Sequence, residues 1–235
     1  MTERRRLLRG ALVVTTESAT LSDILIQGEW IVAVDQNLDA AGAEVVHCGG
    51  LAALPGGIDA HVHLREPGAE HKEDFTSGTQ AALAGGFTTV LDMPNSPVPT
   101  TSLAAFDAKA ALVEAKACCD VGLFFGATPF NVDEASKATR AVGLKVYMGS
   151  STGDLLVADL ADQLRVFGSY PADRALVVHA EDEEAVRLFS AGERRPPICA
   201  ELSVGRALAL ARYTGRRIHV SHASTAVELA AIGLA

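Results

Sequence analysis

The alternation of apolar and polar residues divides the chain near residue 53. Before that point, short apolar runs alternate with polar residues and turn signals, and no helical periodicity occurs. Gly28 and Glu29 mark a hairpin turn between the second and third runs. Residues 1–52 are thus predicted to form a small β module, too thin to bury a core alone. Its expected strands are Leu7–Val14, Leu21–Ile26, Ile31–Val34 and Glu44–Cys48.

After Pro55 the pattern becomes a regular succession of strand-like and helix-like segments. Six strand-then-helix units predict a parallel sheet, either open and doubly wound or closing into a barrel. The expected strands are Gly57–His63, Thr88–Met93, Val121–Ala127, Leu144–Met148, Leu176–Ala180 and Ile218–Ala223. Ala-rich helices are expected at Thr76–Ala84, Ser102–Ala117, Asp133–Val142 and Glu201–Tyr213.

The polar residues that could carry chemistry favour the barrel. They follow several different strands at their carboxyl ends, where barrel enzymes carry their active sites. An open sheet also places its site at the carboxyl ends, but near a single switch point. We therefore predict an α/β fold in which residues 53–235 form an incomplete (β/α)₈ TIM-type barrel of about six βα units. The β module of residues 1–52 precedes it.

The segment GGIDAHVHLREP, residues 56–67, is the most informative part of the chain. Asp59, His61, His63 and Arg65 occupy alternate positions of an expected strand, so their side chains should share one face. Apolar residues at the intervening positions, from Ile58 to Leu64, make the opposite face typical of a buried strand. Two imidazoles with a guanidinium beside them suit a metal centre with an anion-binding group. A pair of surface histidines on an edge strand is the alternative.

Two further histidines end expected strands. His179 closes LVVHAE and His222 closes IHVSHAS. Four histidines at the carboxyl ends of three strands, with no cysteine partner, indicate a borderline metal such as zinc. His219, three residues before His222, should face the other way, toward the helices. His47 and His71 fall in expected loops and carry no such argument.

Lys145, in GLKVYMG, falls inside an apolar strand. An unpaired ammonium is unfavourable in such a place, and nearby divalent cations would lower its pKa. The neutral amine could add carbon dioxide and become a carbamate that bridges two metals. Alternatively, the lysine reaches solvent or pairs with Asp92 or Glu181. The residues alone leave both possibilities open.

Charge and composition exclude several classes of partner. The 235 residues carry a formal net charge of −9 without a basic stripe, which argues against nucleic acid. No apolar run reaches the roughly 18 residues of a membrane span, and the N-terminus lacks the long apolar stretch of a signal peptide. The four cysteines have no CxxC spacing. A reduced, cytoplasmic protein fits these features best.

These segments together resemble the cyclic amidohydrolases, and most closely the dihydroorotases of the large-barrel type. The resemblance spans about residues 50 to 225 and rests on GGIDAHVHLREPG, HKEDFTSGTQAALAGGFTTVLDMPNSP, GLKVYMGSSTG, VVHAE and HVSHAS, in that order. It implies that His61 and His63 bind one zinc ion, that His179 and His222 bind a second, and that carboxylated Lys145 bridges the two. It also implies that the β module is part of a small β-sandwich built from both chain ends.

Arg65 and Asn95 bear on the substrate that the resemblance implies. Dihydroorotate carries a carboxylate, which Arg65 could hold with a bidentate fork and Asn95 with its amide. Hydantoinases, dihydropyrimidinases and allantoinases generally lack this arginine and remain the alternatives, as does a non-catalytic barrel scaffold. The implied reaction is the reversible hydrolysis of dihydroorotate to N-carbamoyl-aspartate, a step of pyrimidine synthesis, by a metal-bridged hydroxide. The loop of residues 149–154, GSSTGD, lacks the phosphate-binding GxxxxGKS/T spacing and is expected to be an ordinary βα loop.

The catalytic acid–base group of the family is an aspartate after the eighth strand. On this resemblance it is expected beyond Ala235, and the 235-residue chain alone is expected to be a fragment with at most weak metal binding and no useful turnover. The whole protein is expected to be a homo-oligomer and could associate with aspartate transcarbamoylase.

Overall fold

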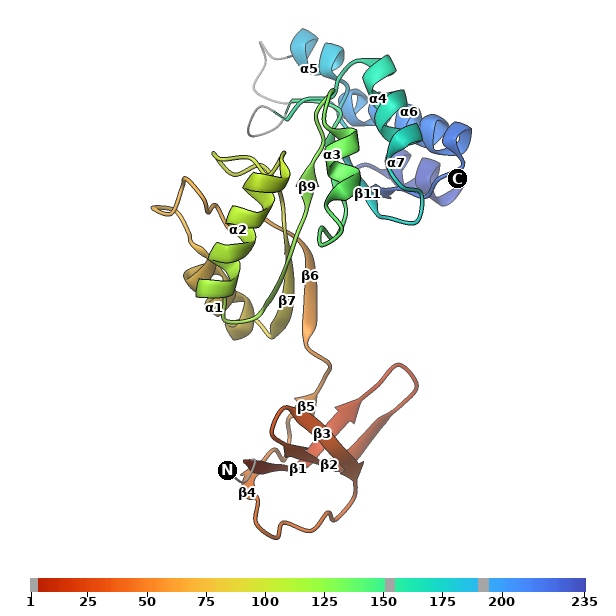
Figure 1. Cartoon of the computed structure of the whole chain (residues 1–235). Helices are drawn as coiled ribbons and strands as arrows, with labels where there is room; N and C mark the ends of the chain where they lie inside the picture. The colour runs from red at the N-terminus through yellow and green to blue at the C-terminus, as the bar shows by residue number, and fades with distance from the viewer. Residues whose placement is uncertain (1–3, 151–154, 190–194) are drawn as a thin grey trace. The chain divides into compact units, whose positions relative to one another are not determined.

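The structure is a computed structural model that describes residues 4–150, 155–189 and 195–235 (Figure 1). It divides into two compact units, Met1–Gly56 and Gly57–Ala235. No helix in the described ranges is long and apolar enough to cross a membrane.

The first unit is one five-stranded sheet in the order β3-β2-β1-β4, with β5 also paired to β1. Gly28, with φ of 60°, forms the tight turn between β2 and β3 where the sequence predicted it. The buried apolar residues in the described part of this unit are Leu7, Ala11, Ile24 and Leu25, which confirms how thin its core is. The strands are β1 (Arg5–Val14), β2 (Ala19–Gln27), β3 (Trp30–Asp35), β4 (Glu44–His47) and β5 (Ala52–Ala53).

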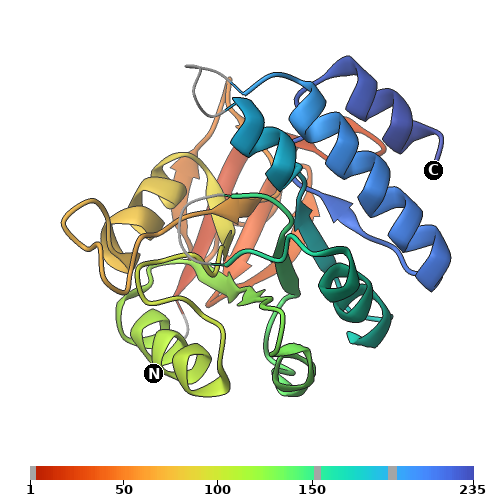
Figure 2. The same ribbon diagram turned by 90° about the horizontal axis from the view of Figure 1, so that it is seen from above.

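The second unit is a partial barrel of parallel strands with helices on the outside, as the sequence predicted (Figure 2). Its strands form two sheets, β6-β7-β8 and β12-β11-β10-β9. The first contains β6 (Gly57–Val62), β7 (Phe87–Asp92) and β8 (Asp120–Leu123), and the second β9 (Phe125–Gly126), β10 (Leu144–Tyr147), β11 (Leu176–His179) and β12 (His219–Val220). The helices are α1 (Phe75–Ala84), α2 (Leu103–Lys116), α3 (Val132–Lys137), α4 (Leu160–Ser169), α5 (Glu183–Phe189), α6 (Ile198–Thr214) and α7 (Ala226–Gly233).

Local chemistry explains where several helices begin. Asp74 and Thr225 cap α1 and α7, each in a reciprocal capping box with the residue three positions on. Asp159 accepts hydrogen bonds from two backbone N–H groups at the start of α4. These caps fix the helix starts independently of the packing that follows.

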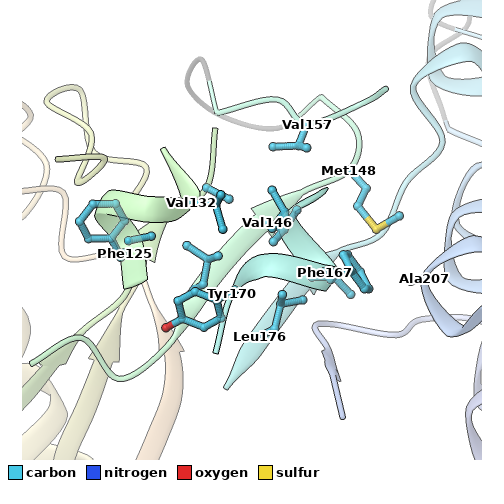
Figure 3. Close-up of a cluster of buried hydrophobic side chains, with 14 of the residues drawn as sticks. Phe125, Val132, Val146, Met148, Val157, Phe167, Tyr170, Leu176 and Ala207 are labelled. Carbon is cyan, nitrogen blue, oxygen red and sulfur yellow. The ribbon is translucent and has the colours of Figure 1, made fainter. Parts of the chain in front are cut away.

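The main hydrophobic core lies between the four-stranded sheet and the helices outside it (Figure 3). Val146 and Leu176 from the strands pack with Phe167 of α4 and Ala207 of α6, and all four are at most 1% exposed. A second cluster of Leu64, Phe75 and Val90 joins the three-stranded sheet to α1. The two cores hold the carboxyl ends of the strands in place.

Three elements differ from the sequence prediction. The expected strand 121–127 is interrupted at Phe124, because residues 120–123 pair with β7 and residues 125–126 pair with β10. The expected helix 133–142 ends at Lys137, where the Arg174 guanidinium donates hydrogen bonds to the carbonyl oxygens of Ser136 and Ala138. The expected strand 218–223 is reduced to β12, because the chain turns away after Val220.

Candidate metal centre

The two histidines of the HVH segment lie at the end of β6, but that strand is irregular. Asp59 pairs with Val90 and Val62 pairs with Asp92, so three residue steps on β6 oppose two on β7. The Asp59 carboxylate accepts a hydrogen bond from the His61 N–H at 3.1 Å within this irregularity. The predicted single face running from Asp59 through His63 is therefore interrupted, and Asp59 supports the backbone at His61.

The expectation of a buried apolar face on this strand was also wrong for its first half. Ile58 is 65% exposed and Ala60 is exposed, whereas Leu64 is only 4% exposed. The reason is that the apolar cluster under α1 takes in Leu64 and Val62 but not the first half of β6, which is the edge strand of its sheet.

His63 is oriented by Asn95. The His63 Nδ1 and Asn95 Oδ1 atoms are 2.8 Å apart, so Nδ1–H donates and the Nε2 lone pair is left available. Metal-binding histidines in proteins commonly donate their second ring N–H in this way. Asn95, which was expected to bind the substrate carboxylate, thus places its carbonyl oxygen on a histidine in this structure.

The four candidate histidines form one continuous group. The ring centroids of His61 and His63 are 5.4 Å apart, those of His61 and His222 are 5.4 Å apart, and those of His179 and His222 are 4.9 Å apart. The side chains come from the ends of β6 and β11 and from the turn after β12. Residues separated by up to 161 positions in the chain (61 to 222) are thus brought together.

His179 and His222 face each other through their nitrogen atoms. His179 Nδ1 lies 3.1 Å from His222 Nε2, and His179 Nε2 lies 3.1 Å from Glu181 Oε2. The hydrogen bond with His179 lowers the Glu181 pKa, and the Arg195 guanidinium also pairs with this carboxylate. Two nitrogens bound at about 2.0–2.1 Å to one tetrahedral zinc ion lie roughly 3.3 Å apart. The observed spacing of the two nitrogens therefore fits a shared metal ion.

The backbone explains why His222 reaches this position. Its φ of 41° lies in the left-handed region, so the chain turns sharply after β12. His219 pairs in register with Val177, which pairs with Lys145, so His219 lies on the Lys145 face of the sheet. The prediction that His219 faces the helices was wrong. It assumed that regular strand alternation continues from His219 to His222, whereas β12 ends at Val220.

Lys145 is fully buried, and neither predicted carboxylate pairs with it. Asp92 pairs with Lys109 at 2.5 Å, and Glu181 pairs with Arg195. Among the described residues, the hydrogen-bond partner of Lys145 Nζ is the Ser221 hydroxyl at 2.7 Å. Burial lowers the Lys145 pKa to about 7, so much of the amine is neutral near pH 7.

Burial favours the neutral, metal-binding form of three of the candidate histidines, His61, His63 and His222. Burial, together with the nearby Lys145, lowers the pKa of His61 to about 3. Burial also lowers the pKa values of His63 and His222. Neutral imidazoles beside a buried, uncompensated amine form a donor set that fits a divalent cation.

The histidines do not complete a metal site by themselves. Within residues 4–150, 155–189 and 195–235, no three His, Cys, Asp or Glu side chains converge to hold a metal ion. A metal held here needs a further ligand. A carbamate on Lys145 would supply two oxygen atoms, and it would remove the buried amine that faces the imidazoles.

Arg65 lies two residues after His63, just beyond the carboxyl end of β6. Its φ of 62° places it in the left-handed region, and its charge lowers the pKa of His63. The guanidinium makes no hydrogen bond or ion pair with any residue in the described ranges. A cation beside a metal centre without an internal partner is available to an anionic ligand.

Sequence reasoning missed the residues that support the site. Ser221 and Lys109 were not assigned roles, and Asp92 and Glu181 were considered only as partners of Lys145. A small hydroxyl residue directly before His222, and an acid two residues after His179, were the available signals. Of the GSSTGD loop, residues 151–154 lie outside the described ranges.

Comparison with known proteins agrees with this geometry. Residues 52–232 match the model of the amidohydrolase family, which is more than two thirds of the chain. The chain belongs to the amidohydrolase family. This amidohydrolase is 39% identical to an allantoinase of Deinococcus radiodurans, over 95% of the chain and 54% of that protein. It is 36% identical to a dihydroorotase of Methanothermobacter thermautotrophicus, over 80% of the chain and 45% of that protein.

A solved structure shows the same fold. The L-hydantoinase (dihydropyrimidinase) of Arthrobacter aurescens superposes with a TM-score of 0.85 at 26% identity, and covers 100% of the chain and 55% of that protein. The amidohydrolase thus has the fold of hydantoinase-type barrels. It spans about half the length of the relatives that it matches.

Proposed function

We propose that this amidohydrolase acts on a cyclic amide that carries a carboxylate, as a dihydroorotase, and converts dihydroorotate reversibly into N-carbamoyl-aspartate. The observation that carries the proposal is Arg65: its guanidinium lies beside His63 and has no partner among the described residues. A bidentate pair with a carboxylate would give it one. Uncharged rings such as allantoin and hydantoin offer no such group.

The proposed centre binds two zinc ions. His61 and His63 would hold one, His179 and His222 the other, and carboxylated Lys145 would bridge them. Metals of this kind lower the pKa of bound water and polarise a carbonyl group. The 3.1 Å spacing of the His179 and His222 nitrogens and the available Nε2 of His63 support this assignment.

The chain's own residues would orient the substrate and the ligands. Arg65 would fix the ring through its carboxylate, so that the amide carbonyl is held in one position relative to the histidines. Asn95 and Glu181 would fix the ring orientations of His63 and His179 through the hydrogen bonds described above. The acid–base aspartate stays a prediction for residues after Ala235, as do the homo-oligomer and the association with aspartate transcarbamoylase.

Equilibrium binding tests the substrate class without requiring turnover. Calorimetric titrations of the zinc-loaded chain with dihydroorotate, allantoin and hydantoin should show the tightest binding for dihydroorotate. Replacing Arg65 by Met should weaken dihydroorotate binding about tenfold or more, the value of a hydrogen bond to a charged group, and leave the uncharged rings unaffected. Arg212→Met, which removes an exposed guanidinium on α6, is the control. Equal affinity of wild type and Arg65→Met for dihydroorotate would refute the proposal.

Allantoinase activity is the second candidate, favoured by the 39% identity to the Deinococcus radiodurans protein. In that case allantoin should bind more tightly than dihydroorotate, and Arg65→Met should not change the preference. Turnover assays of the 235-residue chain and of the protein from its natural source, with each ring in turn, would then separate the two activities.

A further inference from the structure

The buried Lys145 amine is held by a single serine hydroxyl among the described residues. Its Nζ atom is 2.7 Å from the Ser221 hydroxyl oxygen, and both side chains are buried, at 0% and 3% exposure. The face of the Tyr147 ring lies 5.5 Å from Nζ. No carboxylate of the described residues pairs with the amine, so the hydroxyl is its one hydrogen-bonding partner there.

A hydroxyl differs from a carboxylate as a partner for this amine. A carboxylate would neutralise an ammonium and hold it permanently, whereas a serine hydroxyl carries no charge and can both accept and donate a hydrogen bond. Ser221 can therefore serve an amine and an anion in turn, with only a rotation of its O–H bond.

We propose that Ser221 is the positioning residue for the carboxylation of Lys145, which rests on the metal centre proposed above. Its hydroxyl accepts a hydrogen bond from the amine before carbon dioxide adds. Afterwards it donates a charge-assisted hydrogen bond to an oxygen of the carbamate. Nothing in the sequence pattern of metal ligands assigns this role to the residue before His222.

The chemical step balances with carbon dioxide as the only co-reactant. The amine lone pair attacks the carbon atom, an N–C bond forms, and one C=O π pair moves onto oxygen. The nitrogen loses one proton to solvent, which leaves Lys145 as a carbamate anion. Neither oxidation nor reduction occurs. The added negative charge enters close to His61, His63 and His222, whose pKa values the Lys145 charge influences, and it is favoured once cations bind.

The backbone holds Ser221 in place for both states. Its N–H donates to the Val178 carbonyl at 3.0 Å, which extends the β11–β12 pairing by one residue. Val177, the residue before Val178 on β11, pairs in register with Lys145 of β10. Ser221 therefore faces Lys145 from two strands away, and its hydroxyl can change roles without a backbone movement.

The test measures the carbamate directly. The chain is incubated with ¹³C-bicarbonate with and without Zn²⁺, and the carbamate carbon is quantified by ¹³C NMR, with Lys145→Met to identify the signal. Ser221→Ala should lower the carboxylation equilibrium constant about tenfold, and Ser221→Thr, which keeps the hydroxyl, should restore it. Ser203→Ala removes a fully buried hydroxyl on α6 that contacts Met148, and it should leave the signal unchanged.

The outcomes separate two failures. A carbamate in wild type that persists fully in Ser221→Ala overturns the role of Ser221 and leaves the metal centre standing. A wild-type chain that forms no carbamate at saturating Zn²⁺ overturns both this inference and the bridging ligand of the proposed centre. Where Ser221→Ala does not fold, by circular dichroism, Ser221→Cys replaces it, because a thiol has similar size and donates weakly. A Cys variant with an unchanged signal counts against the proposal.

Discussion

Asp92 and Lys109 show how single residues position the candidate centre. Their ion pair is 2.5 Å long, with side chains that are 1% and 2% exposed. The other Asp92 oxygen accepts a hydrogen bond from the N–H of Leu64, between His63 and Arg65, at 2.8 Å. Lys109 also donates to the Met93 carbonyl at 3.2 Å. The pair therefore ties the end of β6 to the end of β7.

Breaking this pair should destabilise the chain strongly. Asp92→Ala leaves the buried Lys109 ammonium without its carboxylate, which we expect to lower the free energy of unfolding by about 3–5 kcal/mol. The double variant Asp92→Asn/Lys109→Met keeps an acceptor for the Leu64 N–H and should recover most of that loss. Urea unfolding measures the free energy of unfolding of both the single and the double variant. Glu114→Ala, which breaks the exposed pair with Arg140, should cost less than about 1 kcal/mol. A similar cost for the buried and the exposed variant would contradict this account.

Lys145 predicts how the stability of the metal-free chain depends on pH. Its folded-state pKa is lowered by burial to about 7, against 10.5 for an unperturbed lysine. Between these values the unfolded chain holds a proton that the folded chain has lost, so stability rises as pH increases from about 7 to 10. Denaturation midpoints in chelator and CO₂-free buffer should show this rise, and Lys145→Met should reduce it. A wild-type slope that Lys145→Met leaves unchanged would rule out Lys145 as its source.

The sequence singled out the candidate histidines but not the residues that contact them. Local periodicity places His61 and His179 at the ends of strands, whereas His222 joins the group through a turn after β12 that periodicity did not predict. The bonds from His63 to Asn95 and from Lys145 to Ser221 join residues 32 and 76 positions apart, so only the packed fold specifies them.

At the scale of elements, the turn after β10 requires a glycine. A Cβ atom on Gly149 would lie 2.3 Å from the Glu181 carbonyl oxygen, and a backbone group cannot yield as a flexible side chain can. This turn holds β10 against the segment that follows His179. A side chain there would push the ends of β10 and β11 apart.

Gly149→Ala should therefore destabilise the chain by about 1–3 kcal/mol and weaken zinc binding. The matched control is Gly205→Ala in α6, where a Cβ meets nothing within 4 Å. That substitution should stabilise the helix by about 0.5–1 kcal/mol. Thermal unfolding of the two variants measures both effects, and a neutral Gly149→Ala would show that the two strand ends can separate freely.

Element boundaries were predictable where local chemistry sets them. Asp74 and Thr225 carry their capping signals in the sequence. The end of α3 depends on Arg174, which comes 37 residues after Lys137, and the break at Phe124 depends on pairing with two different neighbours. Neither the end of α3 nor the break at Phe124 can be read from the periodicity of apolar residues in the sequence.

At the scale of the whole molecule, metal binding should couple to folding. Zinc at 100 times its dissociation constant adds about 2.7 kcal/mol to stability, which corresponds to a rise in Tm of about 5–10 °C for a chain of this size. His179→Asn should remove most of this rise. His71→Asn, in the loop before α1, should keep it. Calorimetric scans with and without zinc decide the matter: equal rises in both variants would place the metal elsewhere.

The order of strands and helices predicted a parallel α/β arrangement, and the polar residues after several strand ends favoured a barrel over an open sheet. The sequence did not show that the barrel strands form two sheets. That division depends on the residues around Phe124, whose hydrogen bonds join Asp92 on one side and, through Phe125, Gly143 on the other.

Because of this division, the residues of the candidate centre come from two different sheets. His61 lies in the three-stranded sheet and His63 just after it, whereas Lys145 and His179 lie in the four-stranded sheet and His222 in the turn that follows β12. The spacing between the halves is therefore set along a seam at residues 120–126 rather than by any single strand. A small shear along that seam would change the distance between the two proposed metal ions. A carbamate bridge from Lys145 would then fix the distance between the two metal ions, which the backbone alone leaves adjustable.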